Sequence, residues 1–464
     1  MSAMTQVSGA GTYLDAFSGL QQRGSHQPEW LRTLREEAFA SFCDTGFPTI
    51  KDEAWRFTSV APISQVAFSL PEPGSSQLKK SDLKPFRISG TACLLVFVNG
   101  RYEPKLSDQT PLAAGVHAGS LADALASDTG ALELQLGLKL SLQNDAFSSL
   151  NTAFIEDGAY IRIARGTVLE APIHLLFLST GTEEPLMFHH RNLIVVESNA
   201  QASVVEEHIS LGDGVTFSNV VTELIAAENA VASHFLIERK NKQSFHVDTL
   251  RIQQERSSNV TSHSFLLGGA LVRNNVHPVF AGEGGECLIN GLFIGDGRQH
   301  LDNYMLVEHA SPRCNSHQFY NGILSDHSHG VFHGRIIVHK DAQKTDSKQT
   351  NRNLLLSDDA QIDTKPQLEI YADDVKCTHG ATIGQMDDNA LFYLRARGLD
   401  ENGARGLLLF AFAGECTGRI KPGPVRAHIE QLVREALPEI SAALAGASES
   451  GGEADAGRNW EEIG

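Results

Sequence analysis

Cys377 and His379 are the two residues of this 464-residue chain whose types and spacing best suit metal chemistry. They stand two positions apart, and residues i and i+2 of an extended strand point to the same face of a sheet. A thiolate beside an imidazole is a suitable ligand pair for iron or another thiophilic metal. Because two ligands do not complete a site, the remaining ligands are expected from elsewhere.

A second candidate metal site is a group of histidines around His329. On a strand, His327 and His329 would share a face and could bind a metal together with His333. No acidic residue stands at a spacing that completes a facial triad with them. Solvent-facing turn residues are therefore the simpler interpretation of this group.

Other chemistries find little support in the sequence. The chain has no GxSxG nucleophile motif, and it has no GxxxxGK[ST] phosphate loop, so we expect it to bind no nucleotide. Carboxylates on one face of a β-solenoid would suit a polysaccharide lyase or hydrolase, although aspartate at coil corners is usually turn chemistry. The aspartates concerned are Asp296, Asp302, Asp326, Asp358 and Asp359.

The composition argues against a nucleic-acid-binding protein. Lys and Arg number 38 against 56 Asp and Glu, which gives a formal net charge of −18, whereas nucleic-acid phosphates require clustered cations. The first residues lack the features of a signal peptide, and no apolar run is long enough for a membrane span. Six scattered cysteines without a CxxC pair indicate free thiols in a reducing, cytoplasmic setting.

The elements that must position Cys377 and His379 begin with a helical N-terminal region, residues 1–85. Its first 25 or so residues are small and polar and are expected to be mobile. Apolar residues then recur with helical spacing after Pro28, and a Pro-, Ser- and Lys-rich stretch at 71–86 marks a boundary.

A repeated turn-and-strand motif predicts that residues 86–385 form a β-solenoid. Its occurrences are spaced by 30, 29, 27, 44 and 30 residues, and the long spacing is interpreted as an insertion. A period near 30 in short strands without intervening helices is typical of stacked coils, with a β-sandwich as the competitor. The motif recurs near Ala200, Ala230, Asn259, Glu286, Gly330 and Ala360.

Three amphipathic helices are predicted at the C-terminal end of the chain, residues 386–446, followed by a disordered acidic tail at 447–464. Asp387 or Asp388 would cap the first helix, Asp400 would precede the second, and the third would begin at Pro424. Apolar residues beyond those needed for a small core would form a docking surface for a partner. The residues assigned to that surface are Leu391, Leu394, Leu407, Leu408 and Phe412.

Several segments resemble the SufB/SufD family of the SUF iron–sulfur cluster assembly machinery. They are KTDSKQTNRNLLLSDDAQIDTKPQLEIYADDVKCTHGATIG, LFYLRARGL, LLLFAFAGE and, near the N-terminus, GFPTIKDEAWRFTSV. The resemblance spans roughly residues 28–435 and is most specific over 344–415. It implies a right-handed parallel β-helix between N-terminal and C-terminal helical regions.

The same resemblance implies a non-catalytic scaffold subunit rather than an enzyme. Family members assemble as SufB, SufD and two copies of the ATPase SufC, with the β-helix ends of SufB and SufD paired and SufC held by the C-terminal helices. A transient iron or iron–sulfur cluster would form at the SufB–SufD interface, with His379 and Cys377 as the candidate ligands and sulfur arriving through SufB.

This chain resembles the SufD type of member more than the SufB type. SufB-type sequences read Glu-His-Glu-Ala-Thr where this chain has Thr378-His379-Gly380-Ala381-Thr382, and their scaffold cysteine falls near Ala360. The HSHGVFH histidines depart from the family pattern. Two other classes stay open on the residues alone: a polysaccharide-cleaving β-helix enzyme and a stand-alone His-rich metal-binding protein.

Overall fold

The computed structural model describes residues 10–23, 28–72, 74, 77–108, 111–127, 132–133, 135–136 and 145–437. The predicted acidic tail at 447–464 lies outside these residues. The chain divides into two compact units, Met1–Ile383 and Gly384–Gly464. No helix among the described residues is long and apolar enough to cross a membrane.

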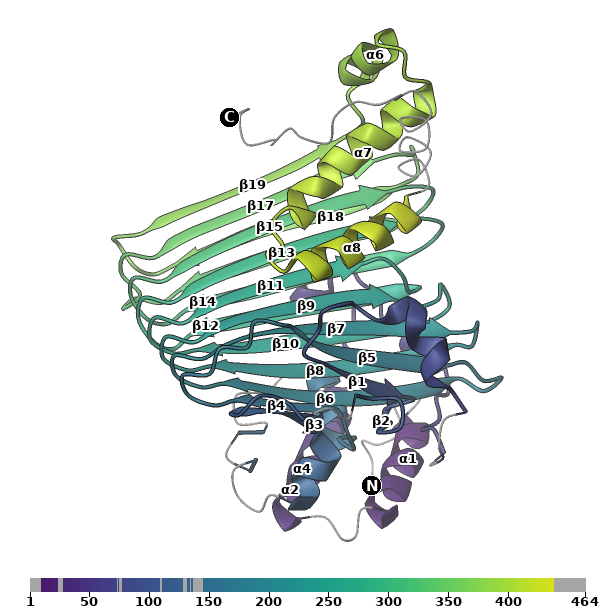
Figure 1. Cartoon of the computed structure of the whole chain (residues 1–464), viewed down its shortest axis with the longest axis vertical. Coiled ribbons are helices and arrows are strands. Elements are labelled where there is room, and N and C mark those ends of the chain that lie inside the picture. Colours follow the sequence, from purple (N-terminus) through teal and green to yellow (C-terminus); the bar gives the residue numbers. More distant parts are fainter. Residues whose placement is uncertain are drawn as a thin grey trace. The chain divides into compact units, whose positions relative to one another are not determined.

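The first unit is a parallel β-solenoid, as the turn-and-strand repeat predicted (Figure 1). One sheet has the strand order β19-β17-β15-β13-β11-β9-β7-β5-β1-β2, and the other has the order β18-β16-β14-β12-β10-β8-β6-β4-β3. The chain therefore passes from one sheet to the other and back in each coil. The strands from β4 onward are β4 (Ala159–Ile163), β5 (Ile173–Thr180), β6 (Leu186–Val196), β7 (Gln201–Leu211), β8 (Thr216–Ala226), β9 (Val231–Arg239), β10 (Phe245–Gln254), β11 (Asn259–Leu266), β12 (Leu271–Phe280), β13 (Glu286–Gly295), β14 (His300–His309), β15 (Asn315–Leu324), β16 (His329–Val338), β17 (Asp346–Leu355), β18 (Gln361–Ile370) and β19 (Lys376–Gly384).

Antiparallel strands border both sheets at the early end of the stack. In one sheet β1 (Cys93–Val98) pairs with β2 (Arg101–Tyr102), and in the other β3 (Val116–Ser120) pairs with β4. At the late end, β18 and β19 are the last strands in the order, and within the described part of the chain each has a paired neighbour on one side only. The two ends of the solenoid therefore differ in strand pairing: antiparallel strands border the early end, whereas the late end has strand edges open to pairing.

The repeat arises from one kind of coil corner. The corners before β7 and β9 each contain an asparagine in the left-handed region, Asn199 and Asn229, both at φ 57°. Asparagine tolerates this conformation because its short polar side chain can hydrogen-bond locally. The prediction of an insertion near Gly330 was wrong: Glu286 begins a strand of one sheet, whereas Gly330 lies on β16 of the other. The spacing of 44 residues spans about one and a half coils, because both corners use similar turn residues, such as Asp326 at φ 53°.

The core lies between the two sheets. Alternate residues of each strand point inward, and Leu236, Leu250, Ile289, Met305 and Phe332 are among the buried side chains that form one continuous apolar cluster along the stack. Each coil covers the inner face of its neighbours, which is the arrangement expected of a solenoid.

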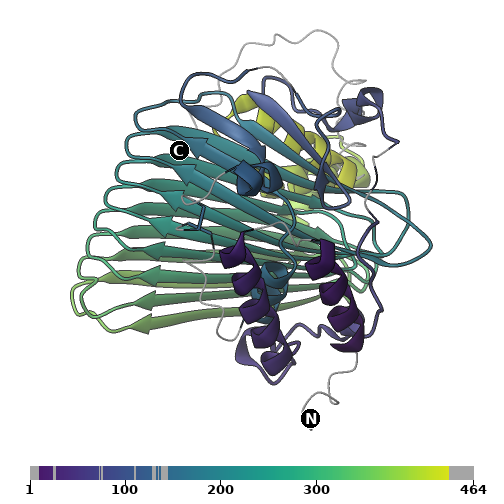
Figure 2. The same ribbon diagram turned by 90° about the horizontal axis from the view of Figure 1, so that it is seen from below.

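Helices pack against the early coils of the first unit. They are α1 (Ala10–Arg23), α2 (Glu29–Thr45), α3 (Ala61–Ser64), α4 (Leu121–Ser127) and α5 (Ala146–Ala153), with short 3₁₀ turns at Glu53–Trp55 and Lys80–Phe86. Figure 2 shows the two purple helices, α1 and α2, side by side. The ring of Phe17 stacks on that of Phe39, with 4.2 Å between the centroids.

The expectation that the first 25 residues are mobile was wrong for Ala10–Arg23. These residues form α1, and Tyr13, Phe17 and Leu20 are buried. Their spacing of four and three residues forms an apolar stripe on one helix face, which packs against the neighbouring aromatic side chains.

The described part of the second unit, residues 384–437, contains three helices, as predicted from its apolar spacing. They are α6 (Asp388–Ala396), α7 (Glu401–Thr417) and α8 (Gly423–Ala436). Asp387 caps α6 by accepting from the backbone N–H of Asn389 at 2.8 Å, and Asp400 caps α7 by accepting from that of Gly403 at 2.6 Å. The carboxylates therefore stabilise the two helix starts.

Candidate functional site

Cys377 and His379 lie on β19, the outermost strand of its sheet. The backbone N–H of Lys376 donates to the carbonyl of Thr345 at 2.8 Å, which ties the start of β19 to the preceding coil. The side-chain amide of Asn353 donates to the carbonyl of Thr382 at 3.3 Å. The strand is thus held from one side, while its other edge offers backbone groups for pairing with another strand.

The Cys377 side chain points toward the interior of the solenoid. It is half-buried and packs against the last members of the core cluster. Burial, together with the charge of Asp346, raises the pKa of the Cys377 thiol. A metal at this position would therefore have to displace a proton from sulfur before the thiolate could bind it.

His379 shares its strand face with Cys377 but is exposed. In every earlier coil, the corresponding face of the strand lies in the covered interior of the solenoid. β19 is the last strand in the order of its sheet, so its inner face lies at the end of the stack. The ligand pair predicted from the sequence is thus brought to one accessible face at the end of the stack. Cys377 and His379 are part of no three-ligand group among the described residues.

Large apolar side chains surround this end of the solenoid. Ile370 is 40% exposed, Tyr371 62% and Ile383 51%, and they come from the ends of β18 and β19 or just beyond. Ile370 lies on the same face of β18 as Leu368, which packs against the core. The terminal coil therefore presents exposed apolar side chains as well as the exposed imidazole, and exposed apolar side chains are of the kind that a partner protein covers.

The histidines around His329 do not gather into a metal site. His329 and His333 are four positions apart on one strand, which places them on the order of 13 Å apart along the chain. His329 instead faces Asp363, with 2.8 Å between Nε2 and Oδ2, and His327 lies 3.7 Å from Asp359. The interpretation as solvent-facing turn residues holds for His327 but was wrong for His333, which is buried on β16, and for His329, which is half-buried on the same strand. The separation and the carboxylate pairs remove the basis for a stand-alone metal-binding protein using this group.

The aspartates considered for polysaccharide cleavage are engaged separately. The buried Asp302 carboxylate pairs with Arg273 at 2.5 Å. Asp296 pairs with Lys242, and Asp326 accepts from the backbone N–H of Gly297 at 2.9 Å across a coil corner. Turn and ion-pair chemistry thus accounts for these three carboxylates.

The residues assigned to partner binding lie on α6 and α7. Leu407 is 42% exposed, and Leu391, Leu394, Leu408 and Phe412 are partly exposed. The sequence analysis did not single out Phe392 and Tyr393, which are 73% and 56% exposed. The i, i+3 and i+4 spacing selects the apolar residues on the less exposed side of each helix. Phe392 and Tyr393 lie outside that spacing and are more exposed.

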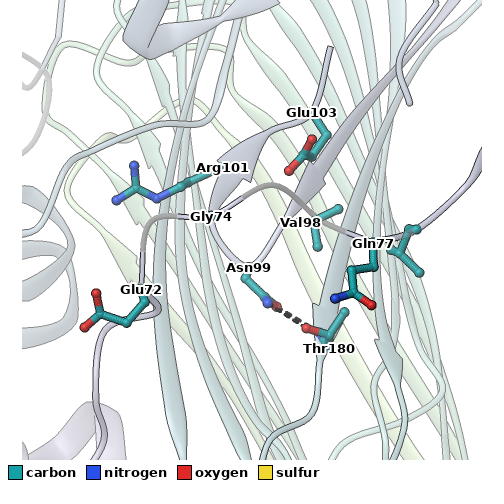
Figure 3. Close-up of a pocket in the computed structure, with 9 residues that line it drawn as sticks. Glu72, Gly74, Gln77, Val98, Asn99, Arg101, Glu103 and Thr180 are labelled. Atoms are coloured by element: carbon teal, nitrogen blue, oxygen red, sulfur yellow. Dashed lines mark hydrogen bonds between the residues drawn. The ribbon is translucent and has the colours of Figure 1, made fainter. Parts of the chain in front are cut away.

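A surface hollow of about 440 Å³ lies far along the sheet from β19, at the β1–β2 turn (Figure 3). Glu72, Arg101 and Glu103 line it, and the Asn99 side-chain amide donates to the Thr180 hydroxyl at 2.6 Å. The lining is mostly polar and open, and it brings no metal-binding group together.

Sequence reasoning missed a group of ionisable residues buried within the solenoid. His208, His246 and Asp248 are at most 1% exposed, and one potential ligand atom from each lies within 4.8 Å of the others. The signal was present as two pairs at i, i+2 spacing, Glu206 with His208 and His246 with Asp248. Only the coil geometry brings the two pairs together.

Comparison with known proteins gives two family matches that together span most of the chain. Residues 177–412 match the SufBD core domain of the SUF system for FeS cluster assembly, and residues 9–175 match the N-terminal region of SufBD proteins. The chain is 35% identical over 395 residues to an iron–sulfur cluster assembly SufBD family protein of Synechocystis, covering 83% of this chain and 86% of that protein. It is 33% identical over 396 residues to the iron–sulfur cluster assembly protein SufD of Escherichia coli K12, covering 85% and 90%. It is 29% identical over 415 residues to the chloroplastic protein ABCI7 of Arabidopsis thaliana, covering 88% and 86%.

Proposed function

The chain belongs to the SufBD family of iron–sulfur cluster assembly proteins, and we propose that it is the SufD-type scaffold subunit of a complex with SufB and the ATPase SufC. The observation that carries this proposal is the late end of the solenoid. Two open edge strands, an exposed apolar surface and the His379 imidazole occur there together.

Pairing with SufB would extend the sheets across two chains. The unpaired edge of β19 offers a row of backbone donors and acceptors, and adding a strand to such an edge is a recurrent mode of protein recognition. Ile370, Tyr371 and Ile383 would then be buried by the partner. Burial of these side chains would stabilise the pair, because the hydrophobic gain is about 25 cal/mol per Å² of apolar surface removed from water.

His379 and Cys377 would contribute ligands to a nascent cluster, which is the cargo of the assembly. SufB would supply the remaining thiolate and the sulfide. His379 is the first residue to test, because its imidazole is exposed and imidazole is a common metal ligand. Cys377 is half-buried with a raised thiol pKa, so its part requires a rearrangement or a proton loss first.

The C-terminal helices would hold SufC. Phe392, Tyr393 and Leu407 are exposed apolar side chains on α6 and α7, and an apolar helix face of this kind suits a protein partner. The chain carries no phosphate-loop motif, so ATP binding and hydrolysis would belong to SufC. ATP-driven approach of two SufC subunits would shift the SufB–SufD pair and admit iron at their interface. The chain itself would be non-catalytic.

The test co-expresses the chain with SufB and SufC and replaces His379 by alanine. Iron and acid-labile sulfide per purified complex are expected to fall several-fold, while the subunit ratio stays unchanged. Thr378→Ala is the matched control, because Thr378 is also exposed on β19 but points to the opposite face. Unchanged cluster content in the His379→Ala complex would contradict the ligand assignment.

A further inference from the structure

The interior of the solenoid is polar between β6 and β10, where an apolar core would be expected. Val204 of β7 and Leu250 of β10 belong to the core cluster, and the alternation of strands places Glu206 and His208, and likewise His246 and Asp248, on the same inward faces. All four of these ionisable side chains are at most 1% exposed. Such a group is costly to bury unless its charges and hydrogen-bonding atoms have partners.

Both carboxylate oxygens of Glu206 have partners, and one of them holds His208 in a defined orientation. Its Oε1 accepts from the Asn192 amide and faces Nε2 of His208, both at 3.0 Å. Its Oε2 accepts from the Thr222 hydroxyl and faces Nε2 of His234, again both at 3.0 Å. Although burial acts to raise it, these imidazole contacts lower the pKa of Glu206 overall. The residue is therefore a carboxylate that receives the Nε2–H of His208.

With Nε2 bound to Glu206, the other ring nitrogen of His208 is available as a lone-pair donor. Nδ1 of His208 is buried and has no hydrogen-bond partner. A carboxylate that accepts from one nitrogen of a histidine, while the second nitrogen faces a cluster of other ligands, is the usual support of a metal-binding imidazole. One ring nitrogen of His208 lies within 4.8 Å of potential ligand atoms of both His246 and Asp248.

The side chains of His246 and Asp248 have no hydrogen-bond partner among the described residues. Both ring nitrogens of His246 and both carboxylate oxygens of Asp248 are buried without a hydrogen bond. Their closest approach, Nε2 to Oδ2, is 3.8 Å, too long for a hydrogen bond. Two ligand atoms on a tetrahedral ion lie about 3.4 Å apart, since each metal–ligand bond is about 2.0–2.2 Å, so a shift of a few tenths of an ångström would let both atoms reach one ion.

We propose that His208, His246 and Asp248 bind a divalent transition-metal ion that resides inside the solenoid. Two imidazoles and one carboxylate form the ligand set of the facial-triad and catalytic-zinc classes of site. Two carboxylates, Asp248 as ligand and Glu206 behind His208, balance the charge of the ion. The site is separate from the Cys377–His379 face and does not depend on the proposed function.

The surrounding charges are compatible with a cation. Lys240 is the nearby buried ammonium, and its Nζ donates to the hydroxyl of Ser179 rather than to the cluster. Glu238 faces Lys240 electrostatically and balances it. Among the described residues, the buried carboxylate of Asp248 is thus left without a compensating cation.

Enclosure on all sides has a kinetic consequence. Because the ligands are covered by neighbouring coils, the ion would enter while the chain folds and would exchange slowly afterwards. A chelator should therefore remove it only from the unfolded chain.

The test uses untagged full-length chain carrying Cys377→Ser and His379→Ala, so that metal at the proposed interface does not contribute. After growth with zinc and dialysis against EDTA, elemental analysis is expected to find about one ion per chain, released on unfolding in denaturant. Refolding with Co²⁺ should give the visible absorption bands of a protein-bound ion and raise the midpoint of unfolding. Loss of the ion to EDTA in the native state, or no Co²⁺ absorption, would overturn the proposal.

Two variants and a control make the test specific. His246→Gln and Asp248→Asn should each lower Co²⁺ affinity by at least tenfold, as loss of a ligand does. Asp248→Asn should also abolish the shift in the unfolding midpoint that Co²⁺ produces. His309→Gln, at an equally buried histidine outside the cluster, should retain one ion. If Asp248→Asn still binds Co²⁺ with unchanged affinity, the cluster is a buried water-linked network only and the assignment is wrong.

Discussion

Arg191 and Glu223 form an ion pair in the protein interior, with 2.6 Å between Nη2 and Oε1. The two residues lie on the neighbouring strands β6 and β8, and both side chains are at most 2% exposed. The second guanidinium nitrogen of Arg191 donates to the side chains of Asn151 and Thr152 in α5 at 3.2 and 3.1 Å. One buried cation thus fastens a helix to two strands.

Removing one partner of this pair should strongly destabilise the fold. In Glu223→Gln the guanidinium stays buried without a counter-charge, and we expect a loss of about 3–5 kcal/mol in the free energy of unfolding. Denaturant titration followed by circular dichroism measures it. The matched control is Glu197→Gln, which breaks the exposed pair with Arg162 and should cost less than about 1 kcal/mol. Equal losses in the two variants would show that burial of the pair is not the reason.

A charge at the late end of the solenoid should prevent pairing with SufB without unfolding the chain. In Ile383→Asp a carboxylate replaces a half-exposed apolar side chain at the end of β19, so association would require its desolvation. We expect SufB recovery on co-purification to fall at least tenfold, with SufC recovery unchanged. Val168→Asp is the control, since Val168 is 59% exposed but precedes β5 near the other end of the stack. If both variants retain SufB, pairing does not use this surface.

The helices of the second unit should be required for SufC capture. Deleting residues 387–440 is expected to abolish SufC recovery while SufB still co-purifies. Phe392→Asp makes the same test with a single residue, because Phe392 is the most exposed of the large apolar side chains on α6. Asn389→Asp changes an exposed residue of the same helix and serves as the charge control. SufC retained on the deleted chain would contradict the assignment.

Buried neutral histidines should make the protein less stable as the pH falls. Burial lowers the pKa of His309 to about 3, whereas the unfolded chain protonates this residue near 6.5. The unfolded state therefore binds the extra proton between these values, and stability present above pH 6.5 is lost toward pH 3. The slope from this residue is about 1.4 kcal/mol per pH unit.

The measurement compares unfolding free energies of the native protein and His309→Gln between pH 7 and pH 4.5. The variant should show a flatter dependence by roughly that slope below the unfolded-state pKa. Its hydrogen-bonding partner, the Ser316 hydroxyl at 2.8 Å, can still be reached by an amide. His339→Gln alters an exposed histidine just after β16 and should leave the slope unchanged. Parallel curves for the native protein and His309→Gln would refute the pH prediction.

The sequence predicted the solenoid because its corners carry residues that a left-handed turn requires. Asn199 and Asn229 recur at the same corner and make the period visible. The corner before β16 also has a residue in the left-handed region, Asp326. The repeated turn pattern therefore did not reveal that Gly330 lies in the other sheet. The α1 stripe was missed because Tyr13, Phe17 and Leu20 are separated by small and polar residues that dilute the helical pattern.

The two groups of candidate ligands show where sequence reasoning stops. Cys377 and His379 are neighbours in the chain, so strand alternation alone places them on one face. His208 and His246 come from different sheets, and their proximity depends on the register and path of the intervening coil. No local pattern contains that information.

The stack of hydrogen-bonded strands from β5 to β19 also sets the length of the solenoid. A β-barrel closes on itself at a fixed strand number, but a stack of coils has no closing point, so the number of coils in the sequence alone sets its length. Each added or deleted coil of about 30 residues would move the end that bears His379 by about 4.8 Å, the spacing of neighbouring strands. The separation between the early coils, against which the N-terminal helices pack, and the late coil that bears His379 can therefore change only in steps of one coil.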